Sequence, residues 1–144
     1  MNTVAMSISG RTGKITLEIS RYERPDARLV SDKNWLAGNV QINVGPFSAA
    51  YEARFETYDF ASFYGEVKNM LETLNGTAHF QCTEECLTLT ISIGSRGEAT
   101  IRGVAKSLES LGTSLNFSFD SDQSYLGRVL DSLGNLCDQF PVLL

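Results

Sequence analysis

The side chains best suited to chemistry in this sequence are one histidine and three cysteines: His79, Cys82, Cys86 and Cys137. Zinc binds nitrogen and sulfur ligands of this kind where four of them converge on one point. Alternating apolar residues over 78–82 predict a strand on which His79 and Cys82 point to opposite faces. Cys86 is out of phase with the apolar residues that follow it, so we expect the ligands to diverge. We therefore predict no metal site, an exposed histidine, and cysteines that act as small apolar fillers.

Catalysis by a nucleophile would depend on the same histidine. A cysteine or serine nucleophile needs a base within hydrogen-bond reach, and no Gly-x-Ser-x-Gly elbow presents a serine. His79 and Cys86 could face one side across a turn, which leaves a thiol enzyme as an alternative. Gly10–Gly13 and Gly94–Gly97 lie between predicted strands, whereas phosphate-binding glycines lead into helices. The sequence therefore predicts a protein that is not an enzyme and has no cofactor.

Neighbouring carboxylates are the remaining candidates for a functional site. Exposed acids in turns and at helix starts are usually solvated, and acid–base catalysis would require burial to shift their pKa. Such acids can instead form an acidic face that steers a basic protein partner. A set of unrelated surface charges is the other interpretation. The candidate partner-binding residues are Asp26, Asp32, Glu84, Glu85, Asp120 and Asp122.

Period-two alternation predicts hairpins in the first half of the chain. The first hairpin covers residues 4–19 and the second covers residues 40–55. The charged segment 21–33 between them is expected to be an exposed loop. Apolar residues at helical spacing then predict a helix over 59–74, with Asp59 as its N-cap.

The second half repeats the order of strands and helix. Alternation predicts strands over 78–82, 87–93, 99–104 and 115–119, with Gly103 as a candidate bulge. Asp120 is the expected N-cap of a final helix, which Pro141 ends. The apolar stripe of this helix comprises Leu126, Val129, Leu130, Leu133, Leu136, Cys137 and Phe140.

The order ββββαββββα predicts an α+β fold. We expect a two-layer sandwich of one mainly antiparallel sheet with two helices on one face, built by residues 1–144 as a single domain.

A pattern of apolar residues and glycine also recurs in the sequence at an offset of 62 positions. Duplication of one unit and two similar solutions to packing both explain it. The matched residues are Phe55, Phe63, Gly65, Val67, Leu71 and Leu74 with Phe117, Tyr125, Gly127, Val129, Leu133 and Leu136.

Composition narrows the classes of partner. The 144 residues are 42% hydrophobic and 20% charged, which is ordinary for a globular domain. A net charge of −5 argues against a nucleic-acid-binding surface and is compatible with a basic protein partner. We see no signal-peptide pattern at the start and no apolar stretch of membrane-spanning length. Three cysteines are an odd number in a chain of a size that needs no disulfides, so we predict a cytoplasmic protein.

Several short motifs between residues 34 and 142 carry a family resemblance. They are Asn34-Trp35-Leu36, Gly45-Pro46-Phe47, Tyr51-Glu52-Ala53, Leu74-Asn75-Gly76-Thr77-Ala78-His79-Phe80, Glu85 with Leu87-Thr88-Leu89, Gly97, Phe117-Ser118-Phe119-Asp120-Ser121-Asp122-Gln123-Ser124-Tyr125-Leu126, and Phe140-Pro141-Val142. In these motifs the chain resembles the WapI-type immunity proteins of bacterial toxin systems. It departs from them at Cys86, where the family has an aromatic residue, and it matches them poorly over its first thirty residues.

The resemblance implies a function as an inhibitor. A WapI-type immunity protein would bind one cognate toxin domain, expected to be a nuclease, and block its active site. It would do so by steric cover or by acidic residues that compete with RNA phosphates. Nucleic acid, membrane and cofactor are not among the implied partners. The alternative is a non-catalytic small-molecule-binding or adaptor domain that uses a pocket between sheet and helices.

Overall fold

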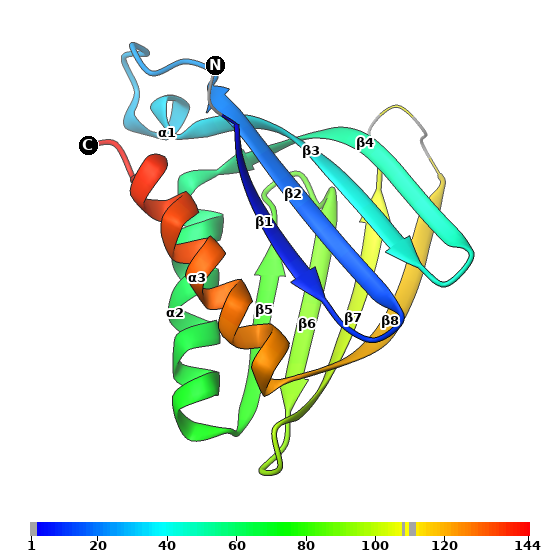
Figure 1. Ribbon diagram of the computed structural model, residues 1–144. Helices are drawn as coiled ribbons and strands as arrows, with labels where there is room; N and C mark the ends of the chain where they lie inside the picture. Colours follow the sequence, from blue (N-terminus) through cyan, green and yellow to red (C-terminus); the bar gives the residue numbers. More distant parts are fainter. Residues whose placement is uncertain (1–2, 108, 110–111) are drawn as a thin grey trace.

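The computed structural model describes residues 3–107, 109 and 112–144 (Figure 1). It confirms the α+β class, with strands and helices that begin close to the expected positions. It also adds a short helix, α1, in the segment that was expected to be only a loop. The elements are β1 (Val4–Ser9), β2 (Gly13–Tyr22), α1 (Val30–Lys33), β3 (Trp35–Val44), β4 (Phe47–Glu56), α2 (Thr57–Thr73), β5 (Gly76–Gln81), β6 (Leu87–Ile93), β7 (Glu98–Lys106), β8 (Ser114–Asp122) and α3 (Gln123–Gln139).

The strands form two sheets where the sequence predicted one. Each sheet has four antiparallel strands in sequence order, β1-β2-β3-β4 and β5-β6-β7-β8. Helix α2 follows β4 without a loop and lies between the last strand of the first sheet and β5, the first strand of the second sheet. Helix α3 packs against β1, α2 packs against β5, and the two helices contact each other (Figure 1). Each half is therefore four strands followed by a helix of 17 residues.

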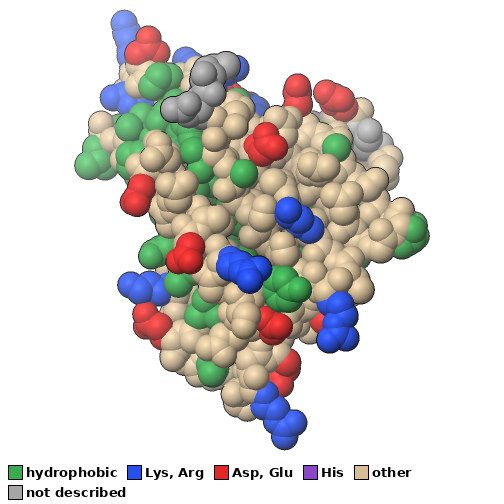
Figure 2. Space-filling view, in the orientation of Figure 1, with side chains coloured by type: hydrophobic (Ala, Val, Ile, Leu, Met, Phe, Trp, Pro, Cys, Tyr) green, Lys and Arg blue, Asp and Glu red, His purple; other side chains and the backbone are tan. Residues whose placement is uncertain are grey.

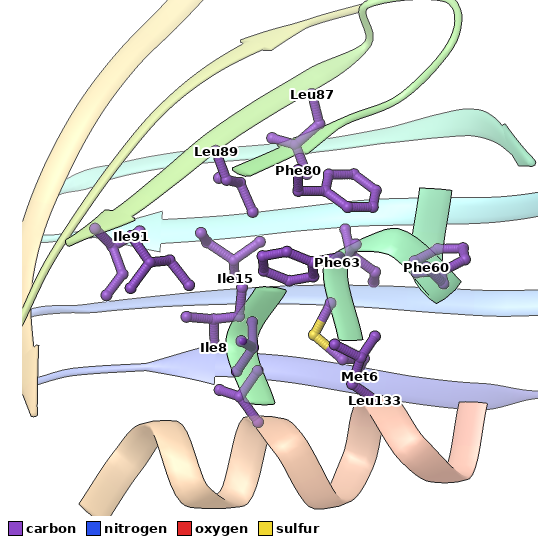
Figure 3. Close-up of a cluster of buried hydrophobic side chains, with 14 of the residues drawn as sticks. Met6, Ile8, Ile15, Phe60, Phe63, Phe80, Leu87, Leu89, Ile91 and Leu133 are labelled. Carbon is purple, nitrogen blue, oxygen red and sulfur yellow. The ribbon is translucent and has the colours of Figure 1, made fainter. Parts of the chain in front are cut away.

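Both sheets and both long helices contribute to one buried core. Met6, Ile8 and Ile15 of the first sheet point toward Leu89 and Ile91 of the second, with side chains of α2 and α3 beside them (Figure 3). Period-two alternation places every second strand residue in this core, as the burial patterns of β1 and β6 show.

Four phenylalanines fill the space between the sheets and α2. The ring centroids of Phe55 and Phe60 are 5.4 Å apart, and those of Phe60 and Phe80 are 5.5 Å apart. Phe63 meets Phe80 edge-on at 5.4 Å. Edge-to-face and tilted contacts of this kind add to the stabilisation that burial alone provides. The interior between sheet and helix is therefore packed with side chains at this position.

The two long helices begin a few residues away from the predicted caps. The N-cap of α2 is Glu56, and Asp59 occupies the third helical position of a capping box. In that box the Glu56 amide donates to Asp59 Oδ2 at 2.8 Å. The N-cap of α3 is Asp122, whose Oδ1 accepts from the Tyr125 amide at 3.1 Å. Asp120 lies in β8, because this strand continues to Asp122, three residues further than the alternation predicted.

Gly103 is not a bulge, because β7 keeps an unbroken register with both of its neighbours. A Cβ at this position would lie 2.4 Å from Cζ of Phe117, so the absent side chain makes room for the ring. Gly13 does the same for Phe119 at the turn between β1 and β2. The described register shift is instead in β2, between Ile19 and Arg21.

Buried Asn34 ties the C-terminal segment to the start of α2. Its Nδ2 donates to the carbonyl of Leu143 at 2.9 Å, and its Oδ1 accepts from the Leu143 amide at 2.7 Å. The same Oδ1 accepts from Thr57 Oγ1 at 2.7 Å. Tyr22 Oη also donates to the Pro141 carbonyl at 2.5 Å. Asn34, Thr57 and Leu143 thus form one polar cluster around a buried side chain, and the Tyr22–Pro141 bond lies exposed at the same end of the chain.

Leu133 and Leu130 lie on the same helix but differ in burial. Leu133 is fully buried, whereas Leu130 is only partly buried against the core. We predict that Leu133→Ala lowers the free energy of unfolding by about 3 kcal/mol and that Leu130→Ala costs less than half of that. Urea unfolding of both variants measures this difference. An equal cost at the two positions would contradict the packing described for α3.

Burial of the Asp59 carboxyl predicts a pH dependence of stability. Burial raises the pKa of Asp59 from 3.8 to about 6, although the hydrogen bond from the Glu56 amide lowers it in part. A pKa that is higher in the folded state gives a stability contribution that is complete below about pH 3.8 and is lost as pH rises through about 6. We therefore expect the free energy of unfolding of the wild type, relative to Asp59→Asn, to fall between pH 4 and pH 6. A flat or rising difference in urea unfolding would contradict this.

Candidate functional site

The structure separates His79 from the cysteines. His79 is exposed on the outer face of β5, where its Nε2 is 3.2 Å from Thr77 Oγ1 and its Nδ1 is 3.4 Å from Thr90 Oγ1. Cys82 is fully buried on the other side of the strand. In the described part of the chain, no three His, Cys, Asp or Glu side chains are close enough to hold a metal ion. The predicted divergence of histidine and cysteine is therefore confirmed.

The expectation that Cys86 diverges from Cys82 is wrong. Both cysteines are buried, and they are paired as a disulfide across the turn between β5 and β6. Cys86 precedes β6, so strand parity does not apply to it, and Glu85 before it has a left-handed φ of 57°. The pairing weakens the compartment inference that was drawn from the cysteine count. It also leaves Cys86 unsuited to act as a nucleophile activated by the exposed His79.

Arg54 holds the β5–β6 turn against β4. Its Nε and Nη2 are each 2.9 Å from a Glu23 carboxylate oxygen, and its Nη1 is 3.7 Å from Glu84 Oε1. The guanidinium group also lies 4.7 Å from the centre of the Trp35 ring. This geometry combines a bidentate ion pair with a cation–π contact. Glu84 is therefore part of an intramolecular network.

Two further hydrogen bonds connect the same turn to β4. Thr83 Oγ1 donates to Glu56 Oε2 at 2.9 Å, and Tyr51 Oη donates to the Cys86 carbonyl at 2.7 Å. Burial raises the pKa of Tyr51 well above its ordinary value. The hydroxyl consequently stays protonated and keeps this contact at any physiological pH.

The six acids predicted to form one face lie in separate places. Asp26 precedes α1 and Asp32 lies within it, 3.8 Å from Arg24. Glu84 and Glu85 lie at the end of the second sheet where Lys106 pairs with Ser114. Asp120 and Asp122 lie at its other end, where Glu98 pairs with Asp122. These ends are roughly 27 Å apart at the rise of an antiparallel strand. The acids therefore do not make one continuous surface.

A different acidic feature lies on the outer face of the first sheet. Glu18 is opposite Asn39, and Asn39 is opposite Glu52, so the three residues form one row across β2, β3 and β4. At the usual strand spacing the Cα atoms of Glu18 and Glu52 are about 10 Å apart. Neither carboxylate has an ion pair among the described residues. Sequence reasoning missed this row because it depends on the register of three strands.

The outer face around this row carries small polar side chains. In the next row Thr16, Gln41 and Ala50 lie side by side. Figure 2 shows a face of the molecule on which acidic and basic groups are scattered among mostly uncharged polar ones. We define the sheet-1 face as the outward residues of β2, β3 and β4 around Glu18, Asn39 and Glu52.

Shallow hollows adjoin Glu52. One of about 370 Å³ is lined by Glu18, Asn39, Gln41, Ala50 and Glu52 among others, all on β2, β3 and β4. Another, of about 630 Å³, lies between Ser48–Glu52 of β4 and residues that include Ala105, Glu109 and Leu115. No Lys or Arg lines either hollow in the part of the chain described. A third hollow, of about 420 Å³, also includes Glu52 and is lined by Arg21 and Arg54. Glu52 therefore faces uncharged and acidic residues on the side of Ala50, and basic residues on the side of Arg54.

Comparison with known proteins identifies a family. The model of the immunity protein WapI-like family matches residues 6–141 of the chain. This confirms the resemblance drawn from the motifs and extends it to β1 and β2, which carry none of those motifs. No curated protein matches the chain. Of the described helices, none has the length and apolar character that a membrane span requires.

The Arg54 network predicts a modest loss of stability on truncation. We expect Arg54→Ala to lower the free energy of unfolding by about 1–2 kcal/mol, because it removes two partly exposed ion pairs and the contact with Trp35. Arg54→Lys keeps the charge but loses the bidentate geometry, so we expect an intermediate loss. Urea unfolding measures both. A lysine variant as stable as the wild type would show that charge alone holds the turn.

Proposed function

We propose that this chain, which belongs to the immunity protein WapI-like family, binds and neutralises one cognate bacterial toxin domain. The family match carries the proposal, because it spans nearly all of the described strands and helices. An immunity protein acts by forming a complex, so its surface and not a catalytic centre determines its activity.

We propose that the toxin domain is a nuclease and that binding blocks its active site. A nuclease presents basic groups to the phosphates of its substrate, and a carboxylate surface can occupy those groups. The net charge of −5 supports this choice of target, as do Glu18 and Glu52, for which the described residues provide no ion pair. A toxin that cleaves intracellular nucleic acid would have to be met in the cytoplasm, which is where we place the complex.

The acids predicted from the sequence differ in their availability for such a complex. Glu84 pairs with Arg54, Asp32 pairs with Arg24, and Asp122 caps α3. We propose that any contribution of this set to toxin binding comes from Asp26, Glu85 and Asp120, which are exposed. Because Asp120 lies far from Glu85 along the second sheet, a single contact would include one of them and not both.

The rival function, binding of a small molecule between sheet and helices, receives no support from the packing. Phe55, Phe60, Phe63 and Phe80 occupy that space with ring-to-ring contacts. The hollow of about 370 Å³ lies on the outer face of the first sheet, and the one of about 630 Å³ lies between β4 and residues of β7, β8 and their connection. Neither hollow is lined by a described residue of α2 or α3. Their shape suits a protein surface better than an enclosed ligand.

A reconstitution with the toxin domain encoded beside this chain tests the proposal. We expect a stable complex by size-exclusion chromatography with light scattering, and loss of RNA or DNA cleavage when the chain is in excess. The association rate should fall as salt concentration rises, because opposite charges steer the encounter. A small acidic protein of unrelated fold at the same concentration is the control for non-specific charge effects.

Full cleavage activity in the presence of excess chain, with no detectable complex, would refute the proposed function. Equal inhibition by the unrelated acidic control would show that charge alone inhibits the enzyme.

A further inference from the structure

Of the four outer strands of the two sheets, two are covered by helices and β8 is contacted at one end. Helix α3 packs against β1, and α2 packs against β5. The end of β8 lies against the turn between β1 and β2, where the Arg11 amide donates to the Asp120 carbonyl at 3.2 Å and Ser121 Oγ donates to the Ser9 carbonyl at 2.7 Å. The fourth outer strand is β4, which pairs with β3 and with no other described strand.

The end of β4 next to α2 is also covered. Arg54 and Glu56 contact the β5–β6 turn through Glu84 and Thr83. The Glu56 amide donates to Asp59. Within the described residues this leaves Ser48–Glu52 as the open stretch of the strand, about 17 Å long at the usual rise per residue.

The register shows which backbone groups of this stretch face outward. Gly45 and Pro46 form a two-residue turn, so Val44 and Phe47 close the hairpin as a hydrogen-bonded pair. Hydrogen-bonded pairs then recur at odd positions of β4. The N–H and C=O groups of Ser48, Ala50 and Glu52 therefore point away from β3, toward the open edge.

From Ser48 to Glu52 this edge has no Lys, Pro, bulge or described covering segment, and Glu52 is its one charged residue. Proteins block such edges with Lys, Pro, bulges or covering segments. Here Ser48 and Ala50 are small and exposed, and β4 pairs with β3 without a register shift. An unprotected edge of this kind can accept an added strand from a partner.

The charge beside the edge indicates the chemistry of the partner. Glu52 is exposed, has no ion pair among the described residues and lies in a row with Glu18. A cation on a neighbouring strand would form a favourable cross-strand pair with Glu52. The hollow of about 630 Å³ beside Ser48–Glu52 has Glu52 and Glu109 in its lining and no basic residue among the described ones.

We propose that an extended basic segment of the toxin domain pairs as an added strand with Ser48–Glu52 and places a Lys or Arg beside Glu52. This inference rests on the proposed function and names the surface that performs it. Backbone hydrogen bonds to Ser48, Ala50 and Glu52 provide affinity, and the carboxylates of the sheet-1 face select a basic strand.

A second copy of the chain is a less suitable occupant of the same edge. Antiparallel pairing of two β4 strands about Ala50 would place uncharged Ser48 opposite Glu52 and leave the carboxylate without a cation. Each copy also carries a net charge of −5, which opposes association.

The test compares Ala50→Pro with Ala50→Val in binding to the toxin domain encoded beside this chain. Proline removes the outward N–H and is tolerated on edge strands, whereas valine keeps the N–H and favours strand geometry. We expect Ala50→Pro to raise the Kd at least about tenfold and Ala50→Val to leave it within about threefold.

A second pair of variants tests the charge beside the edge. Glu52→Gln should slow association severalfold at low salt. Glu72→Gln on α2 makes the same change in net charge and should leave the association rate unchanged.

Amide exchange in the wild-type complex gives a readout that needs no variant. The amides of Ser48, Ala50 and Glu52 should become protected on binding, whereas those of Ala49 and Tyr51 already bond to β3 and should change little. Because amide exchange uses the wild-type chain, it tests the added strand even if Ala50→Pro fails to fold.

The outcomes separate this inference from the proposed function. Toxin inhibition with unchanged exchange at Ser48, Ala50 and Glu52 would overturn the added strand and leave the immunity function in place. A dimer of the chain alone that Ala50→Pro dissociates would assign the edge to a second copy and also overturn the proposal. Absence of any complex with the wild type would refute both.

Discussion

The constraint on which the structure depends is that two sheets and two long helices share a single core. Alternate residues of the strands, such as Ile15 and Ile91, point into that core, and the stripes of α2 and α3 complete it. Each helix starts directly at the end of a strand, at Glu56 and at Asp122, so the position of the strand fixes the position of the helix. Loss of packing at one point would therefore disturb both sheets.

This commitment of apolar side chains to the interior determines what the surface can do. The outer faces carry Ser, Thr, Asn, Gln and a few charged residues, and the buried polar residue Asn34 serves to hold the C-terminal segment. Arg54 and Tyr51 fix the β5–β6 turn against β4. The same contacts end the open edge of β4, so the network that stabilises the turn also limits the surface offered to a partner.

Much of the fold could be predicted from periodicity, and the failures have physical causes. Alternation located the strands and helical spacing located α2 and α3, because burial on one side imposes both patterns. The number of sheets could not be read in this way, since alternation does not say whether β5 pairs with β4. The bulge expected at Gly103 was wrong because a glycine under the Phe117 ring looks like a slip in the apolar pattern.

The candidate site was less predictable than the fold. The sequence singled out acids by their proximity along the chain, and the structure separates Glu84 from Asp120 by the length of a strand. The row of Glu18, Asn39 and Glu52 comes from three strands whose register the sequence does not specify. Cys86 was assigned by strand parity although it lies in a turn, where parity does not hold. The family, by contrast, was recognisable from short motifs, because a motif is read from the order of residues along the chain and does not depend on strand register.

A stoichiometric titration tests most directly whether this chain acts by occupying its target. The toxin domain is held well above the Kd and its cleavage activity is measured as the chain is added in steps. The account predicts a linear loss of activity with a break at one chain per toxin domain. Complete inactivation by a small fraction of an equivalent would show a catalytic mode of action and would contradict it.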